Sequence, residues 1–138
     1  MPHPTDGPRP TPVVGLAVVH RRYVPASHAH YGGHLVDGAY VLGLFGDAVT
    51  ELCIRTDGDE GLFASYRDVQ FLAPVRGGDV LEVTATLVRV GRRSRDIALV
   101  AQVSARSAPH RGPSAADVLD PPLVVTTAHG TVVVPAQD

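Results

Sequence analysis

Hydrophobic and polar residues alternate along two stretches in the second half of the chain. In Val80 to Val90, apolar residues occupy every second position and glutamate or threonine stands between them, and Ile97 to Val103 repeats the pattern. A period of two predicts half-buried strands, and the turn residues at positions 90–94 predict a hairpin between them. Leu62 to Val75 and Leu123 to Val134 are predicted as two further strands.

A different pattern precedes these strands. Val13 to Tyr23 is rich in valine and predicts a first strand, followed by a loop over Val24 to His34. From Leu35 to Arg55, apolar residues recur almost all round a predicted helix, whereas a surface helix confines its polar residues to one broad face. We therefore expect a buried helix that stops at Gly58.

One strand, one long helix and four closely spaced strands predict an α+β fold, in which an antiparallel sheet wraps around one central helix. Arg106 to Pro122 shows no periodicity and is predicted to be a long loop with one helical turn at Ala115 to Leu119. Residues 1–12 are predicted to be a disordered tail before a single domain over residues 13–138. The fold leaves an edge strand and part of the helix uncovered, so we expect a homodimer or a higher oligomer built from dimers.

Composition excludes several functions. A chain of 138 residues fits one domain, and its net charge of −2 gives no electrostatic case for binding nucleic acid or an anionic membrane. All twelve basic residues are arginine, so Schiff-base chemistry, pyridoxal phosphate attachment and a phosphate-loop lysine are excluded. The sequence shows neither a membrane span nor a signal peptide, and we expect a cytoplasmic protein.

Two acids on the predicted helix are the first candidates for chemistry. Asp47 and Glu51 are four residues apart, which places their side chains on the same side of a helix, among apolar neighbours. Two close carboxylates in dry surroundings repel, so one is expected to keep its proton near neutral pH while the other stays ionised, as an acid and base pair requires. They could also receive a cationic group of a substrate. The alternative is a partly exposed polar stripe without function.

The glycine-rich loop before the helix is the second candidate. Tyr31-Gly32-Gly33 would let a ligand approach the backbone closely. Free N–H groups in the first helical turn can then bind a carbonyl oxygen that gains negative charge. An ordinary flexible loop explains the glycines equally well. Asp37, near the helix start, could either cap the helix or contact the substrate.

Three histidines in this region, His28, His30 and His34, resemble metal ligands together with Asp37. Their spacing matches no recognised metal motif, so we expect no metal site.

Other residues have simpler interpretations. Arg92, Arg93 and Arg95 in the predicted hairpin form either a solvated turn or a contact to phosphates. Tyr66 is more typical of a core tyrosine whose hydroxyl is hydrogen-bonded. Cys53, the single cysteine, is expected in the core rather than as a nucleophile.

The chain also carries motifs, in order, that point to a known family: Ala29-His30-Tyr31, Leu35-Val36-Asp37-Gly38-Ala39, Gly46-Asp47, Thr50-Glu51-Leu52, Asp57-Gly58-Asp59-Glu60-Gly61-Leu62-Phe63, Phe71-Leu72-Ala73-Pro74-Val75, Val90-Gly91, Ser94-Arg95 and Asp117-Val118-Leu119-Asp120. On these motifs the chain resembles proteins of the hot-dog fold, and more specifically the small ammonia lyases of 3-aminoacyl-CoA thioesters. Within that group it is most similar to the 3-aminobutyryl-CoA enzymes of lysine fermentation. It departs from the pattern at His28, where an acid is usual, and at His34, where asparagine is usual.

The resemblance implies a dimer in which two subunits build each active site. It also implies reversible loss of ammonia from a 3-aminoacyl-CoA, such as 3-aminobutyryl-CoA giving crotonyl-CoA, with no cofactor beyond the coenzyme A of the substrate. We expect Glu51 to be the base and Asp47 to hold the ammonium group, and these two roles could be exchanged. Asp37 is expected to complete the catalytic set. The expected substrate-binding residues are His30, Tyr31, Gly32, Gly33, Gly38, Tyr66 and Arg95.

Two other functions remain open at this point. An acyl-CoA thioesterase on the same scaffold would need only one helix carboxylate to activate water. A ligand-binding or dimerisation module would bind acyl-CoA without turnover.

Overall fold

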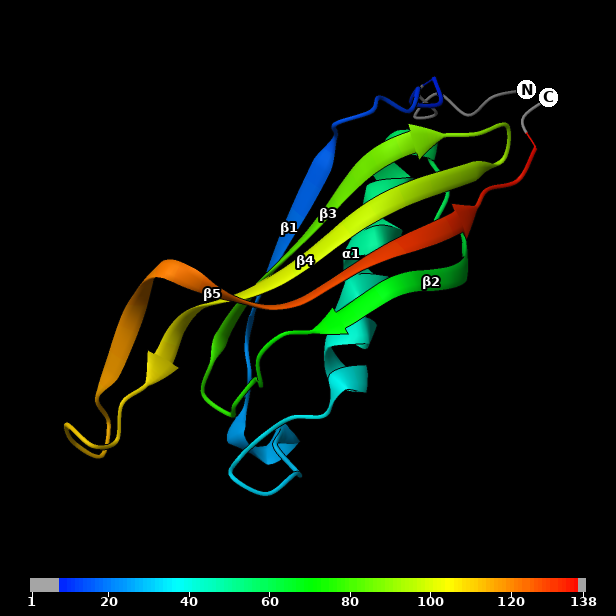
Figure 1. Ribbon diagram of the computed structural model, residues 1–138. Coiled ribbons are helices and arrows are strands. Elements are labelled where there is room, and N and C mark those ends of the chain that lie inside the picture. The colour runs from blue at the N-terminus through cyan, green and yellow to red at the C-terminus, as the bar shows by residue number, and fades with distance from the viewer. Residues whose placement is uncertain (1–7, 137–138) are drawn as a thin grey trace.

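The structure is a computed structural model, and it describes residues 8–136. Its five strands form one antiparallel sheet in the order β1-β3-β4-β5-β2, and the long helix lies across one face of the sheet (Figure 1). The predicted α+β hot-dog architecture is confirmed. The elements in chain order are β1 (Ala17–Tyr23), a 3₁₀ turn (Ala26–His28), α1 (Gly38–Asp57), β2 (Leu62–Phe71), β3 (Val80–Val90), β4 (Ser94–Ser107) and β5 (Ala116–Val133).

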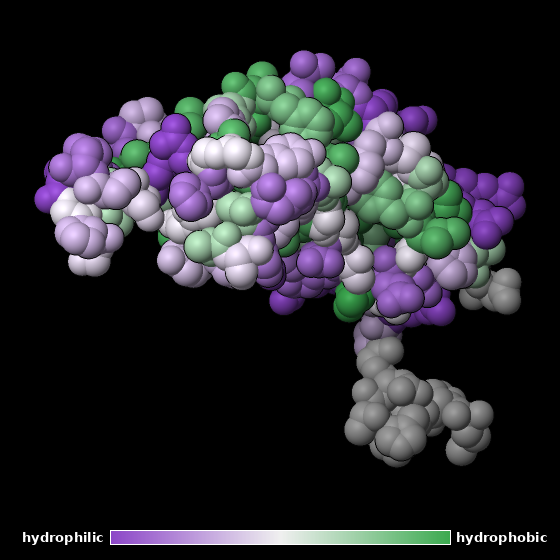
Figure 2. All heavy atoms as spheres, turned by 90° about the horizontal axis from the view of Figure 1, so that it is seen from below, coloured by the Kyte–Doolittle hydropathy of each residue, from purple (hydrophilic) through white to green (hydrophobic). Residues whose placement is uncertain are grey.

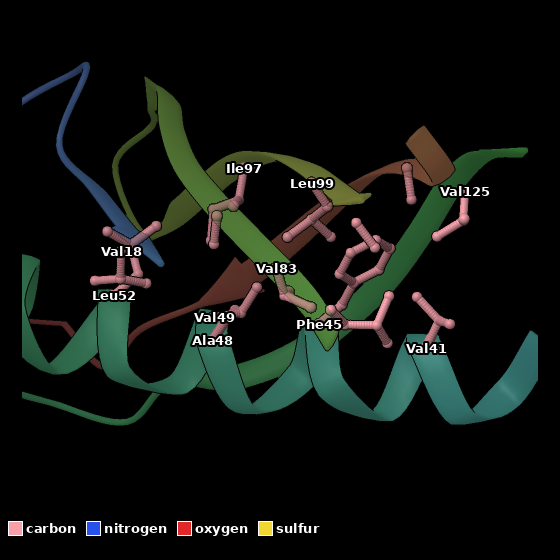
Figure 3. Packing of buried hydrophobic residues seen from close by; sticks show 14 of the residues in the cluster. Val18, Val41, Phe45, Ala48, Val49, Leu52, Val83, Ile97, Leu99 and Val125 are labelled. Carbon is pink, nitrogen blue, oxygen red and sulfur yellow. The ribbon is translucent and has the colours of Figure 1, made fainter. Parts of the chain in front are cut away.

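The core lies between the helix and the concave face of the sheet. Alternate residues of β3 and β4 point inward and are buried, as their period of two predicts. Phe45 and Leu52 of α1 are fully buried against the sheet, and Figure 3 shows Phe45 directed toward Val83 and Leu99, and Leu52 beside Val18. Burying each such side chain contributes about 1.5 to 3 kcal/mol.

The helix begins later than predicted and is covered on one side only. Asp37 is the N-cap and Gly38 the first helical residue, because Leu35 pairs instead with Tyr31 and with Arg76. The expectation of burial all round is wrong: Ile54 is 50% exposed, since a single sheet covers one face of a helix. The predicted stop is confirmed. Gly58 adopts a left-handed φ of 66°, and its N–H donates to the carbonyl oxygen of Ile54 at 2.9 Å.

The predicted loop over Arg106 to Pro122 is limited to residues 108–115, and the predicted helical turn at Ala115 to Leu119 is wrong. Strand β4 continues to Ser107, and β5 starts at Ala116, directly opposite Ser107 in the ladder. These two strand ends form an arm that projects beyond the body of the sheet (Figure 1). The side chains of the arm are exposed or only partly buried, so its residues show no apolar alternation although its backbone is paired.

The predicted tail at residues 1–12 falls mostly outside the described residues; residues 8–12 have no regular secondary structure. Within residues 8–136, no helix combines the length and the hydropathy needed to cross a membrane.

Both edges of the sheet are open, and apolar side chains lie along one of them. Leu62 and Phe71, at the two ends of edge strand β2, are 74% and 57% exposed, and Leu72 follows at 59%. Figure 2 shows that apolar atoms reach the surface between polar ones at the end of the molecule that carries the start of α1. Unpaired edges with apolar side chains favour pairing with a second chain.

Candidate active site

The start of α1 borders a cavity of about 410 Å³. The loop before the helix forms one wall, and the end of β2 with the segment after it forms the other. The lining is largely apolar apart from Asp37 and Thr126. The residues that line the cavity are Tyr31, Leu35, Val36, Asp37, Gly38, Val41, Phe71, Leu72, Ala73, Pro74, Val75 and Thr126. We call these residues, together with the neighbouring His30, the helix-start cluster.

Asp37 occupies the N-cap position, yet its side chain makes no capping hydrogen bond. Its Oδ1 lies 3.5 Å from Nδ1 of His30, and the carboxylate is 24% exposed at the cavity. The side chain of Asp37 therefore does not cap the helix, which was one of the two roles predicted for this residue. The carboxylate remains accessible to a ligand in the cavity.

Gly38 and the glycine-rich loop allow close approach at the helix start. A Cβ atom at Gly38 would lie 2.7 Å from the ring of Phe71, so only glycine lets that ring pack against the first turn. Gly33 has a φ of +75°, which favours glycine, whereas Gly32 is exposed with open space around its Cα. Tyr31 is 55% exposed and its ring contacts the ring of His30 edge to face.

A second group of polar residues lies at the middle of α1, next to edge strand β1. We call His20, Asp47, Glu51 and Arg55 the helix-middle cluster. Glu51 accepts hydrogen bonds from Nε of Arg55 at 2.6 Å and from Nε2 of His20 at 2.7 Å. Asp47 and His20 together line a small cavity of about 90 Å³ between β1 and the helix.

The electrostatics of Glu51 differ from the expectation for a dry pocket. The hydrogen bond from Arg55, and next the one from His20, hold the pKa of the Glu51 carboxyl below its ordinary value. Its side chain is 38% exposed, and Asp47 is exposed as well. The prediction that one carboxyl keeps its proton by desolvation is thus wrong for Glu51. The carboxylate lies on the uncovered face of the helix, where it is in contact with solvent and with the side chains of Arg55 and His20.

The two clusters lie far apart within one chain. Asp37 and Glu51 are separated by fourteen positions, which corresponds to about 21 Å along the helix axis. One chain therefore cannot place both carboxylates on the same small reacting group.

Two predicted substrate-binding residues have structural roles. Arg95 is buried and forms a two-pronged ion pair with Asp57, at 2.9 and 2.6 Å, while its remaining nitrogen donates to backbone carbonyls. It therefore fixes the β3–β4 turn to the end of α1, and its side chain is only 7% exposed. Tyr66 donates its hydroxyl to the carbonyl oxygen of Leu42 at 2.6 Å, as expected of a core tyrosine. Burial raises its pKa, with a smaller contribution from the charge of Asp47.

Cys53 is fully buried, and desolvation raises the pKa of its thiol to about 11. The thiol is therefore protonated at neutral pH, and Cys53 belongs to the core as expected.

The histidines near the helix start do not converge. His28 Nδ1 lies 3.0 Å from the hydroxyl of Tyr40, and His30 faces Asp37. Over residues 8–136, no three side chains of the metal-binding types are grouped so that they could hold an ion.

Sequence reasoning missed His20 and the pairing of Arg55. A signal for each was present. His20 stands two positions after the buried Val18 on a strand, so it shares the inward face. Arg55 follows Glu51 by four positions, the spacing of an ion pair on a helix.

Comparison with known proteins identifies the family of the chain. Residues 32–100 match the thioesterase superfamily. The chain is 50% identical over 110 residues to a 3-aminobutyryl-CoA ammonia lyase of Acetoanaerobium sticklandii. This alignment covers 80% of this chain and 87% of that protein.

Solved structures of an ammonia lyase and of a thioesterase also resemble this chain. A β-alanyl-CoA:ammonia lyase from Clostridium propionicum superimposes with a TM-score of 0.83 at 34% identity, covering 91% of this chain and 94% of that one. A hexameric hot-dog thioesterase of Campylobacter jejuni shares the fold. It superimposes with a TM-score of 0.68 at 19% identity, covering 85% of this chain and 81% of that one. The chain belongs to the thioesterase superfamily and, within it, to the family of 3-aminobutyryl-CoA and β-alanyl-CoA ammonia lyases.

Proposed function

We propose that the protein catalyses the reversible elimination of ammonia from a 3-aminoacyl-CoA thioester. The name of a 50% identical relative favours 3-aminobutyryl-CoA as the substrate, which would give crotonyl-CoA. The observation that carries this proposal is the state of Glu51. Its carboxylate is held by Arg55 and His20, which keeps it ionised at neutral pH and fixed in orientation. An ionised, positioned carboxylate is the form of a base that accepts a proton from carbon.

In the proposed reaction, Glu51 accepts the proton from the carbon next to the thioester carbonyl. The electron pair of that C–H bond forms the new double bond, the C–N bond breaks, and ammonia leaves with the electrons of that bond. Asp47, on the same side of the helix, binds the ammonium group before it departs. N–H groups at the start of α1 stabilise the negative charge that develops on the carbonyl oxygen. No metal or prosthetic group takes part in this scheme.

We propose that the site is completed by a second copy of the chain. The separation of about 21 Å along the helix means that Asp37 and its cavity must meet Glu51 of another subunit. The open sheet edges and the uncovered face of α1 supply surface for such a dimer. Relatives of the same fold are described as hexameric, so dimers can assemble further. We place this activity in the cytoplasm, where acyl-CoA thioesters are made and used.

One assay tests the function. The protein is mixed with crotonyl-CoA and ammonium, and the enoyl absorbance and free thiol are followed together. Loss of absorbance without thiol release supports the lyase. Thiol release would instead show the thioesterase, and tight binding of the thioester with neither change would show a binding module.

A further inference from the structure

A second cavity, of about 450 Å³, adjoins the cavity of the helix-start cluster. The two share the lining residues Leu35 and Pro74, and we call these two adjoining cavities together the groove. The second cavity lies between the glycine-rich loop and the base of the β4–β5 arm. Its lining is Gly33, His34, Leu35, Pro74, Arg76, Gly77, Arg106, Ser107 and Pro109.

This cavity carries positive charge without an acidic residue in its lining. The charge of Arg106 is compensated, because its guanidinium makes two 2.9 Å hydrogen bonds to Asp79, whose side chain is 0% exposed. Arg76 is different. Its backbone N–H donates to Asp79 at 2.8 Å, but its exposed guanidinium has no hydrogen bond or ion pair with any residue between positions 8 and 136.

Backbone contacts hold the groove in shape around Arg76. Leu35 pairs with Arg76 in a β-bridge, and the N–H of Gly77 donates to the carbonyl oxygen of His34 at 2.9 Å. His34 adopts a left-handed φ of 60°, and His34 and Ser107 line the same cavity as Arg76. A cation and two hydrogen-bonding groups thus border one hollow beside the helix start.

We propose that Arg76, with His34 and Ser107 beside it, binds the phosphate groups of the coenzyme A part of the substrate. This inference rests on the proposed function. With the thioester at the start of α1, the pantetheine arm lies along the apolar passage at Leu35 and Pro74 and brings the phosphates to Arg76. A guanidinium that lacks a carboxylate partner matches a phosphate in charge and in hydrogen-bonding geometry.

A rival location lies at the opposite end of the helix. Arg92 and Arg93 are exposed in the β3–β4 turn and line another cavity, of about 300 Å³, together with the paired Arg95 and Asp57. That cavity shares no residue with the helix-start cavity. A coenzyme A chain that leaves the start of α1 therefore enters the groove at Arg76 first.

The test compares three thioesters of the same acyl group: those of coenzyme A, of 3′-dephospho-coenzyme A and of pantetheine. Arg76→Ala is expected to raise the KM of the coenzyme A thioester about tenfold, the typical effect of losing one charged hydrogen bond, with kcat within about twofold. The KM of the pantetheine thioester should not change. Arg76→Lys should fall between wild type and Arg76→Ala, and an Arg92→Ala/Arg93→Ala double variant is the matched control.

An equal rise of KM on the pantetheine thioester, an unchanged KM on all three, or a rise found only in the Arg92/Arg93 control would each overturn the assignment. Binding of free coenzyme A, measured by calorimetry, separates this inference from the proposed reaction. If wild-type protein binds coenzyme A and Arg76→Ala weakens that binding, the phosphate site stands even without lyase turnover. If Arg76→Ala binds coenzyme A as wild type does, the site is refuted whatever the enzyme catalyses.

Discussion

The Nε2 atom of His20 lies 2.7 Å from Oε1 of Glu51 and so ties edge strand β1 to the middle of α1. Glu51 also accepts a hydrogen bond from Arg55, one helical turn further on. The carboxylate is thus held from two directions, one across the fold and one along the helix. A side chain that is 38% exposed acquires a defined orientation in this way.

The first prediction concerns pH. The folded pKa of Glu51 is depressed, chiefly by Arg55, so its carboxylate is ionised throughout the neutral range and gains a proton only as the pH falls through that lowered value. Arg55→Met raises the pKa toward its ordinary value, and the acidic limb of the kcat/KM profile should move to higher pH. His20→Phe should move it in the same direction. Arg89→Met, which removes an arginine paired with Asp96 instead, serves as control and should leave the limb in place. Identical limbs in all four proteins would show that Glu51 is not the group being titrated.

The second prediction concerns the base itself. Glu51→Gln keeps the size of the side chain but removes its ability to accept a proton, so lyase turnover should fall by about 10² to 10⁴. Circular dichroism and thermal melting would establish that the variant is folded. A folded Glu51→Gln protein with wild-type kcat would reject the assignment.

The third prediction concerns the shared site. Asp37→Asn and Glu51→Gln should each be inactive alone, because each damages every site of the oligomer. After mixing, unfolding and refolding together, hybrid dimers contain one site with both native carboxylates, and up to about a quarter of wild-type activity should return. Failure to recover activity, with hybrids demonstrated by native mass spectrometry, would place both residues in the same chain's site.

The fourth prediction concerns stability. Asp57 is 0% exposed and Arg95 7%, so Arg95→Met leaves an unpaired carboxylate in the interior and should cost about 3 to 5 kcal/mol in urea unfolding. Arg111→Met removes the exposed partner of Asp117 and should cost no more than about 1 kcal/mol. Equal losses in the two variants would mean that the Arg95 pair is no more important than a surface contact.

The fifth prediction concerns Gly38. A methyl group there would meet the ring of Phe71 at 2.7 Å, so Gly38→Ala should push that exposed ring away and alter the cavity at the helix start. We expect a raised KM with a loss of stability below about 1 kcal/mol, because the ring can rotate into solvent. Gly38→Ala combined with Phe71→Ala removes the clash and tests whether the ring is the cause. A KM that stays normal in Gly38→Ala would separate this contact from substrate binding.

Most of the fold could be predicted from local patterns. The alternation in β3 and β4, the turn between them and the glycine that ends α1 depend on neighbours in sequence, and all three are confirmed. The arm formed by the end of β4 and the start of β5 could not be predicted in this way. Its two strands pair through their backbones, and its exposed or partly buried side chains show no apolar alternation.

The same distinction between local patterns and long-range contacts applies to the candidate active site. The sequence alone placed Asp47 and Glu51 on one side of a helix and put the glycine-rich loop before its first turn, because both follow from spacing along the chain. Only the tertiary structure brought His20 from another strand to Glu51 and paired Arg95 with Asp57. The physical reason is that contacts between residues distant in sequence depend on how the sheet pairs and which face of the helix it covers, and these are properties of the folded chain as a whole.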